Sequence, residues 1–140
     1  MNAETLFFLL NFLAAFGWLL LIITPYSRLT GKLVLRPIIP AILALLYLSL
    51  IGIVLQRGVQ VLDFSLMGLA EFATDPWVFV LGWAHVVCFD LMVGVWMATD
   101  ARRRQIRHRW MIIPYLLTFM LGPIGLLVYL GMTQLARKSN

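Results

Sequence analysis

The sequence predicts an all-α membrane protein of four transmembrane helices, with a short amphipathic segment between the second and the third. Hydrophobic residues make up 62% of the 140 residues and charged residues only 12%, whereas about a quarter of a soluble domain is charged. The apolar residues form long uninterrupted runs, and lipid requires every backbone polar group to pair within the chain, which favours helices. The length fits one domain comprising residues 1–140.

Four apolar runs reach the roughly 20 residues that a helix needs to cross a bilayer. The first contains no charge and ends before Pro25, and the second begins with Pro37, which is tolerated in a first helical turn. Asp75 followed by Pro76 is typical of a helix start and predicts where the third span begins. The four predicted spans are about 5–24, 37–56, 77–98 and 110–131.

A weaker pattern lies between the second and third spans. Leu62, Leu66, Leu69 and Phe72 recur at intervals of three and four residues, as on one face of a helix. This segment is too short and too charged to span, so we predict an amphipathic helix at the membrane interface. A plain loop outside the membrane is the alternative.

The basic residues predict the orientation. The loop after the first span holds Arg28, Lys32 and Arg36, and the loop after the third holds five arginines between 102 and 109, together eight of the eleven Lys and Arg. Such loops face the cytoplasm, so we expect a multi-pass inner-membrane protein with its N-terminus and C-terminus outside. No soluble recognition fold accompanies these bases, which predicts contact with membrane lipid and no nucleic acid.

Two ionisable residues, His85 and Asp90, lie inside the third span. A carboxyl group near the middle of a span costs about 2.5 to 3.5 kcal/mol on insertion scales and needs a partner or a function. Helical geometry turns the two side chains about 140° apart, with an axial offset of about 7.5 Å. We therefore expect each to contact a different neighbour. Interhelical hydrogen bonding alone is the structural alternative for both.

Other candidates surround this pair. Asp100 is expected to pair with the cluster of Arg102, Arg103 and Arg104. A proline within the fourth span removes a backbone donor, and the glycine before it leaves room for a neighbouring helix or a ligand. Two histidines are too few for a di-iron or bis-histidine haem site, and we predict neither metal nor cofactor. The candidate substrate-binding residues, for which core packing is the alternative, are Trp83, Phe89, Gly94, Trp96, Gly122 and Pro123.

The segment 83–104 resembles a known family through its W-x-H-x4-D-x3-G spacing and the following Asp-Ala-Arg-Arg-Arg, together with Gly-Pro-Ile-Gly at 122–125. It is similar to the abscisic-acid-deficient-type membrane family, whose plant members are associated with neoxanthin synthase activity. We expect no N-terminal transit extension, in which the sequence differs from the plant members and resembles the short bacterial ones. The resemblance covers most of the chain.

This resemblance implies an enzyme, or a component of one, that acts on a carotenoid or a similar lipophilic isoprenoid within the bilayer. In neoxanthin formation an epoxide opens while a proton leaves a neighbouring carbon, which requires an acid and a base. His85 and Asp90 are the candidate catalytic residues, with Glu71 as a third. Two alternatives remain open: a non-catalytic scaffold or accessory subunit, and a small proton-coupled transporter in which Asp90 carries the proton. A homo-oligomer is compatible with each of these.

Overall fold

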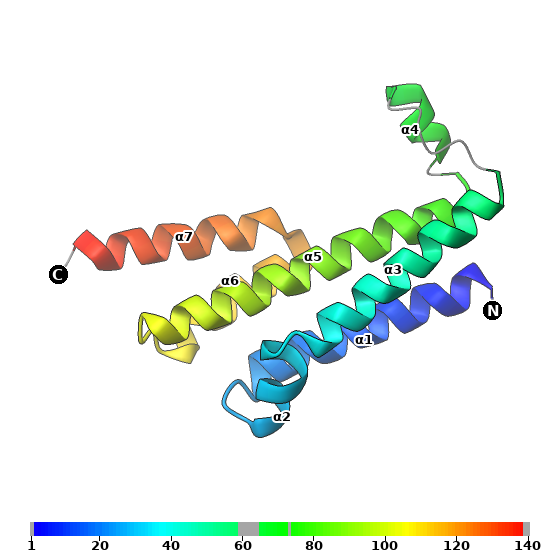
Figure 1. Ribbon diagram of the computed structural model, residues 1–140. Helices are drawn as coiled ribbons and strands as arrows, with labels where there is room; N and C mark the ends of the chain where they lie inside the picture. The colour runs from blue at the N-terminus through cyan, green and yellow to red at the C-terminus, as the bar shows by residue number, and fades with distance from the viewer. Residues whose placement is uncertain (1, 59–64, 73, 139–140) are drawn as a thin grey trace.

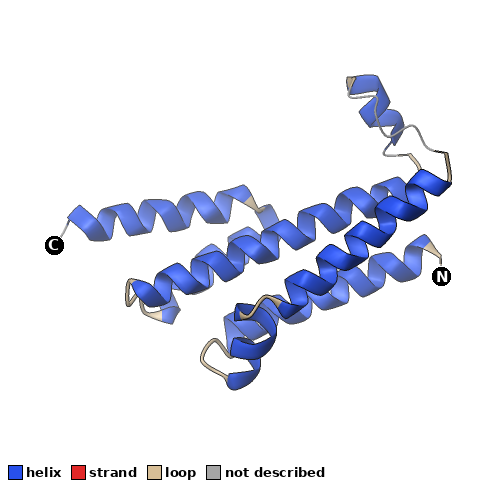
Figure 2. Ribbon diagram, in the orientation of Figure 1, coloured by secondary structure: helices blue, strands red, loops and turns tan. Residues whose placement is uncertain are grey.

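The computed structural model describes residues 2–58, 65–72 and 74–138, and the described residues are almost entirely helical, with no strand among them (Figure 2). This confirms the predicted all-α class. The elements, labelled in Figure 1, are α1 Ala3–Ile23, α2 Arg28–Thr30, the π-helical segment η1 Gly31–Leu35, α3 Ile38–Gln56, α4 Leu66–Phe72, α5 Pro76–Arg103, α6 His108–Leu121 and α7 Pro123–Lys138.

Three helical stretches within the described ranges are long and apolar enough to cross a membrane: Ala3–Ile23, Arg28–Gln56 and Pro76–Arg103. The local signals that start them act as predicted. Asp75 Oδ1 accepts a hydrogen bond from the backbone N–H of Trp77 at 2.7 Å, with Pro76 in the first turn. Pro37 precedes α3 directly. The first three predicted spans therefore correspond to α1, α3 and α5.

Helices α1, α3 and α5 pack side by side, with α1 and α5 running in the same direction and α3 opposite to them (Figure 1). Two glycines permit the close approach of α1 and α5. A Cβ atom on Gly94 would lie 2.7 Å from the Trp18 ring, and one on Gly17 would lie 2.8 Å from the Leu91 side chain. Small residues at helix contacts are typical of membrane bundles, in which packing drives association.

The prediction of one continuous helix at 110–131 is wrong, because the chain reverses at Gly122. Gly122 has a φ of 48°, in a region that favours glycine, and separates α6 from α7. Pro123 begins a new helix here and does not kink an existing one. With 14 and 16 residues, α6 and α7 are roughly 21 and 24 Å long, and each is shorter than the roughly 30 Å hydrocarbon core.

The α6–α7 hairpin returns along α5 to the end from which α6 starts. Its turn lies beside Asp90 near the middle of α5, and Tyr129 of α7 hydrogen-bonds to Asp100 near the end of α5. The start of α1 and the end of α7 consequently lie at opposite ends of the bundle (Figure 1). This arrangement differs from the expectation that both ends of the chain share one side.

Helix α4 occupies part of the predicted amphipathic segment. Its backbone is helical over Leu66–Phe72, and Figure 1 shows it beyond the end of the bundle at which α5 begins. Leu62 and the side chains of Leu69 and Phe72 lie outside the described part of the chain. The predicted apolar face of this segment therefore stays a prediction.

We predict that Gly125→Ala destabilises the α6–α7 hairpin. The added methyl group would overlap the backbone of Thr118 and of Pro114, and a backbone clash is harder to relieve than one with a flexible side chain. We expect the free energy of unfolding to fall by about 2 kcal/mol or more, measured by thermal unfolding in detergent micelles.

The matched control is Gly131→Ala on α7, where the methyl group meets nothing within 4 Å. We expect it to be neutral or slightly stabilising, because alanine favours a helix by about 0.5 to 1 kcal/mol over glycine. Equal stabilities of the two variants would contradict the tight turn.

Candidate functional site

A hollow of about 610 Å³ lies between α1, α5 and the α6–α7 turn. Small apolar residues line its middle, namely Ala14 and Ala15 of α1 and Val86 of α5. At its rim Phe119 and Met120 are 47% and 76% exposed, so the hollow opens sideways to the outer surface of the bundle.

Asp90 is the ionisable residue of this cavity. Its carboxyl group is partly buried and makes no hydrogen bond or ion pair with any residue in the described part of the chain. It faces the α6–α7 turn so closely that a Cβ atom on Gly122 would lie 3.0 Å from Asp90 Oδ1. Glycine at position 122 therefore serves both the backbone reversal and the space beside the carboxyl group.

Asn11 and Trp83 place a second pair of hydrogen-bonding side chains in the same cavity. Trp83 Nε1 donates to Asn11 Oδ1 at 3.1 Å, and Asn11 Nδ2 donates to the Phe7 carbonyl oxygen at 2.7 Å. Trp83 precedes Asp90 by two helical turns, or about 10 Å along α5. Asn11 was not among the predicted site residues. The sequence signal that points to Asn11 is a polar amide side chain within the apolar run of the first predicted span.

His85 lies on a different face of α5. It is exposed, its ring stacks on Phe89 at 4.6 Å, and it lies 5.7 Å from the Tyr47 ring of α3. It does not line the Asp90 cavity. The two side chains diverge as the helical angle requires, and the structure does not bring them together. The third candidate, Glu71, belongs to α4, and its side chain lies outside the described part of the chain.

The predicted substrate-binding residues divide into three groups. Trp83, Gly122 and Pro123 line the Asp90 cavity. Gly94 lies under the Trp18 ring, where it allows helix packing. The remaining two, Phe89 and Trp96, line a separate hollow of about 390 Å³ between α5 and α7, with Met92, Val93, Leu126 and Leu130. That second hollow has no polar side chain.

Asp100 holds α7 against α5. Its Oδ2 accepts hydrogen bonds from the Tyr129 hydroxyl at 2.6 Å and from Arg104 Nε at 2.6 Å. Within the predicted cluster of Arg102, Arg103 and Arg104, the hydrogen-bonded partner is the residue four positions on, which shares the helix face of Asp100. Arg104 is the ion-pair partner.

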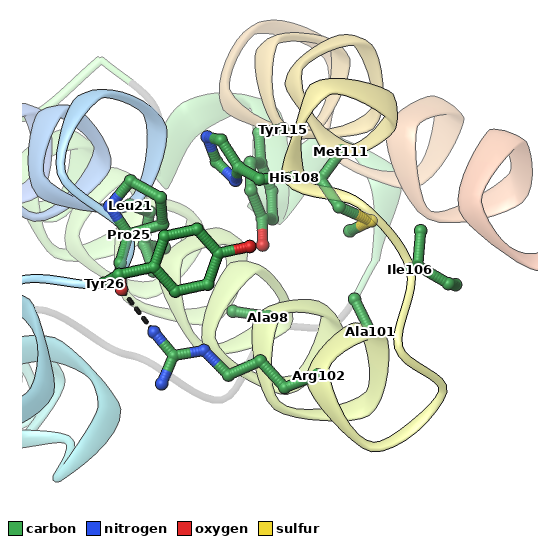
Figure 3. A pocket seen from close by; sticks show the side chains of 10 residues that line it. All are labelled: Leu21, Pro25, Tyr26, Ala98, Ala101, Arg102, Ile106, His108, Met111 and Tyr115. Atoms are coloured by element: carbon green, nitrogen blue, oxygen red, sulfur yellow. Dashed lines mark hydrogen bonds between the residues drawn. The ribbon is translucent and has the colours of Figure 1, made fainter.

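Arg102 instead joins α5 to the end of α1 (Figure 3). It donates to the Pro25 carbonyl oxygen, and its guanidinium carbon lies 5.6 Å from the centre of the Tyr26 ring. Nearby, His108 Nε2 lies 2.8 Å from the Ile22 carbonyl oxygen. The hollow among these residues measures about 20 Å³, which is room for about one water molecule. Within this hollow Arg102 and His108 make structural contacts between the α5–α6 region and the end of α1.

The chemistry available in the Asp90 cavity is that of one carboxyl group with an amide and an indole N–H. Across the described ranges, no three His, Cys, Asp or Glu side chains gather closely enough to hold a metal ion. Three long apolar helices are the features of a helical membrane protein, and the cavity with its carboxyl group lies against two of them, α1 and α5.

The family model described as ABA DEFICIENT 4-like matches residues 5–129, and the chain belongs to this family. The predicted family resemblance is thereby confirmed. Comparisons with curated proteins and with solved structures found no match.

We predict that Tyr129→Phe loosens α7 from α5. The substitution removes the hydrogen bond to Asp100 and leaves the ring contact with Trp96, whose centroid lies 5.6 Å away. The expected loss in unfolding free energy is about 1 kcal/mol, measured by thermal unfolding in micelles. Tyr47→Phe is the control, since the Tyr47 hydroxyl makes no hydrogen bond among the described residues. An equal effect of both substitutions would argue against the Asp100 contact.

Proposed function

We propose that this protein binds an apolar isoprenoid such as a carotenoid in the Asp90 cavity and isomerises it by acid/base chemistry. One observation carries the proposal: the Asp90 carboxyl group lacks a partner in the described part of the chain and opens into a largely apolar hollow of about 610 Å³. Because an embedded carboxyl group is costly to insert, one without a partner indicates a functional site.

The shape of the cavity supports an elongated apolar substrate with a polar oxygen. The stretch between Trp83 and Asp90 is lined by alanine and valine side chains, which contact hydrocarbon without competing hydrogen bonds. Asp90 provides the hydrogen-bonding group at one end, and Asn11 with Trp83 provides another. The isoprenoid class itself comes from the family resemblance, whose plant members are associated with neoxanthin synthase activity.

A single carboxyl group is sufficient for the proton transfers of an epoxide-to-allene isomerisation. In its neutral form Asp90 donates a proton to the epoxide oxygen as the carbon–oxygen bond breaks. Its second oxygen accepts the proton that leaves the neighbouring carbon, and the electron pair of that C–H bond forms the new double bond. The carboxyl group ends protonated as it began. No electron is gained or lost, so the reaction needs no redox partner.

The scheme assigns no proton transfer to His85, which lies outside the cavity. Its ring contacts Phe89 and Tyr47 on the face toward α3. Substituting His85 therefore separates this scheme from one that uses two catalytic side chains.

We predict that Asp90→Asn abolishes conversion while His85→Ala retains most of it. Asparagine keeps the shape of the side chain but cannot exchange a proton, and losing a general acid/base group costs about a hundredfold or more in rate. The measurement is chromatography of pigments from carotenoid-producing cells that express each variant at matched levels.

Wild-type activity in the Asp90→Asn variant would rule out this role for Asp90. Unchanged pigments in the wild type, with every carotenoid supplied, would instead favour a scaffold. Uptake driven by a pH gradient into proteoliposomes, lost in Asp90→Asn, would identify a transporter.

A second prediction concerns occupancy of the cavity. Ala15→Phe places a large ring into the middle of the hollow, away from the Asp90 carboxyl group, and should weaken carotenoid binding without removing the acid. Ala41→Phe on the exposed side of α3 adds the same ring outside the cavity and should bind as the wild type does. Quenching of tryptophan fluorescence by a hydroxylated carotenoid in micelles measures the binding affinity of both variants. Indistinguishable affinities would place the binding site elsewhere.

A further inference from the structure

The α6–α7 turn lies deep in the bundle. Gly122 abuts Asp90, which is near the middle of α5, and α5 is long enough to cross a membrane. Neither α6 nor α7 is long enough to cross by itself. The turn is consequently at the depth of the hydrocarbon core.

The backbone of this turn is adapted to such a position. The Gly122 N–H donates to the Thr118 carbonyl oxygen at 2.9 Å, and the Gly125 N–H donates to the Gly122 carbonyl oxygen at 3.2 Å. Pro123 has no N–H to satisfy. Non-helical backbone at membrane depth is tolerated where it is buried in protein or lines a cavity, and this turn lines the Asp90 cavity.

Beyond the turn, α7 leads back to the end of α5. Tyr129 contacts Trp96 and Asp100 in succession, since its ring lies 5.6 Å from the Trp96 ring and its hydroxyl donates to Asp100. The loop between α5 and α6 is at this same end, where Arg102 and His108 contact the end of α1. The last turn of α7 therefore points toward the side that carries both basic loops.

This return path gathers nearly all the positive charge of the chain at one end. By position in the described helices and loops, all of the eleven Lys and Arg residues except Arg57 belong to that end, including Arg137 and Lys138 at the end of α7. A four-span path would have moved these last two to the opposite side. The side chains of Arg28, Arg103 and Arg107 are exposed. The one acid described at that end, Asp100, is paired with Arg104 and Tyr129.

We infer that α6 and α7 form a re-entrant hairpin, which enters and leaves the bilayer on the basic side, and that the basic end so assembled binds anionic phospholipid headgroups. Exposed cations next to membrane-spanning helices attract anionic headgroups. The same distribution follows the rule that basic segments stay on the cytoplasmic side. The inference is independent of the isomerase proposal, because it requires no particular substrate.

The topology is tested with single cysteines in a Cys88→Ser background. Glu4→Cys, Gln105→Cys and Ser139→Cys are each treated with a membrane-impermeant maleimide in sealed vesicles of known orientation, before and after permeabilisation. Ser139→Cys and Gln105→Cys are expected to react with the maleimide in the same condition, either before or only after permeabilisation. Glu4→Cys is expected to react in the other condition. Labelling of Ser139→Cys together with Glu4→Cys would show a fourth crossing and overturn the hairpin.

The lipid partner is tested in phosphatidylcholine vesicles that contain a trace of dansyl-labelled phosphatidylglycerol or dansyl-labelled phosphatidylcholine. Energy transfer from tryptophan reports how strongly each lipid is enriched around the protein. The Arg103→Gln/Arg107→Gln variant should lose the preference for the anionic lipid by about fivefold or more, whereas Arg57→Gln at the opposite end should keep it. Equal enrichment of both lipids around the wild type, or an equal loss in Arg57→Gln, would overturn the lipid assignment.

Discussion

The contact between the Gly122 turn and Asp90 is the constraint on which the rest of the structure depends. Reversal of the chain at Gly122 closes one end of a cavity that α1 and α5 alone would leave open to lipid. It also brings Gly122 so close to the Asp90 carboxyl group that a Cβ atom there would lie 3.0 Å from Oδ1. A side chain at position 122 would occupy that space, so the fold and the candidate site share one requirement.

Contacts away from the cavity hold this turn in place. At the basic end Asp100 ties α7 to α5 through Tyr129, while Arg102 ties α5 to the end of α1. Both are hydrogen bonds of side chains near the end of α5, namely Asp100 and Arg102. The hairpin is thus supported at its turn by close packing and at its open end by polar contacts.

The arrangement narrows the chemistry that the site can perform. A cavity with one carboxyl group and no second titratable side chain among its lining residues favours a proton relay through that group. His85, although only five residues away along α5, contacts aromatic rings on the face toward α3. Helical periodicity separates them, and no bend in α5 brings them back together.

The sequence by itself determined what local energetics control: the apolar runs of three spans, the helix start at Asp75 and Pro76, the basic loops, and the prominence of Asp90 in a span. Hydropathy, helix capping and charge each depend on a few neighbouring residues, so the sequence alone predicts them. Only the tertiary structure decided that the fourth apolar run folds back at Gly122, and that Asn11 meets Trp83, 72 residues away. A spanning helix and a hairpin bury similar apolar residues, so composition cannot choose between them; packing against α5 does.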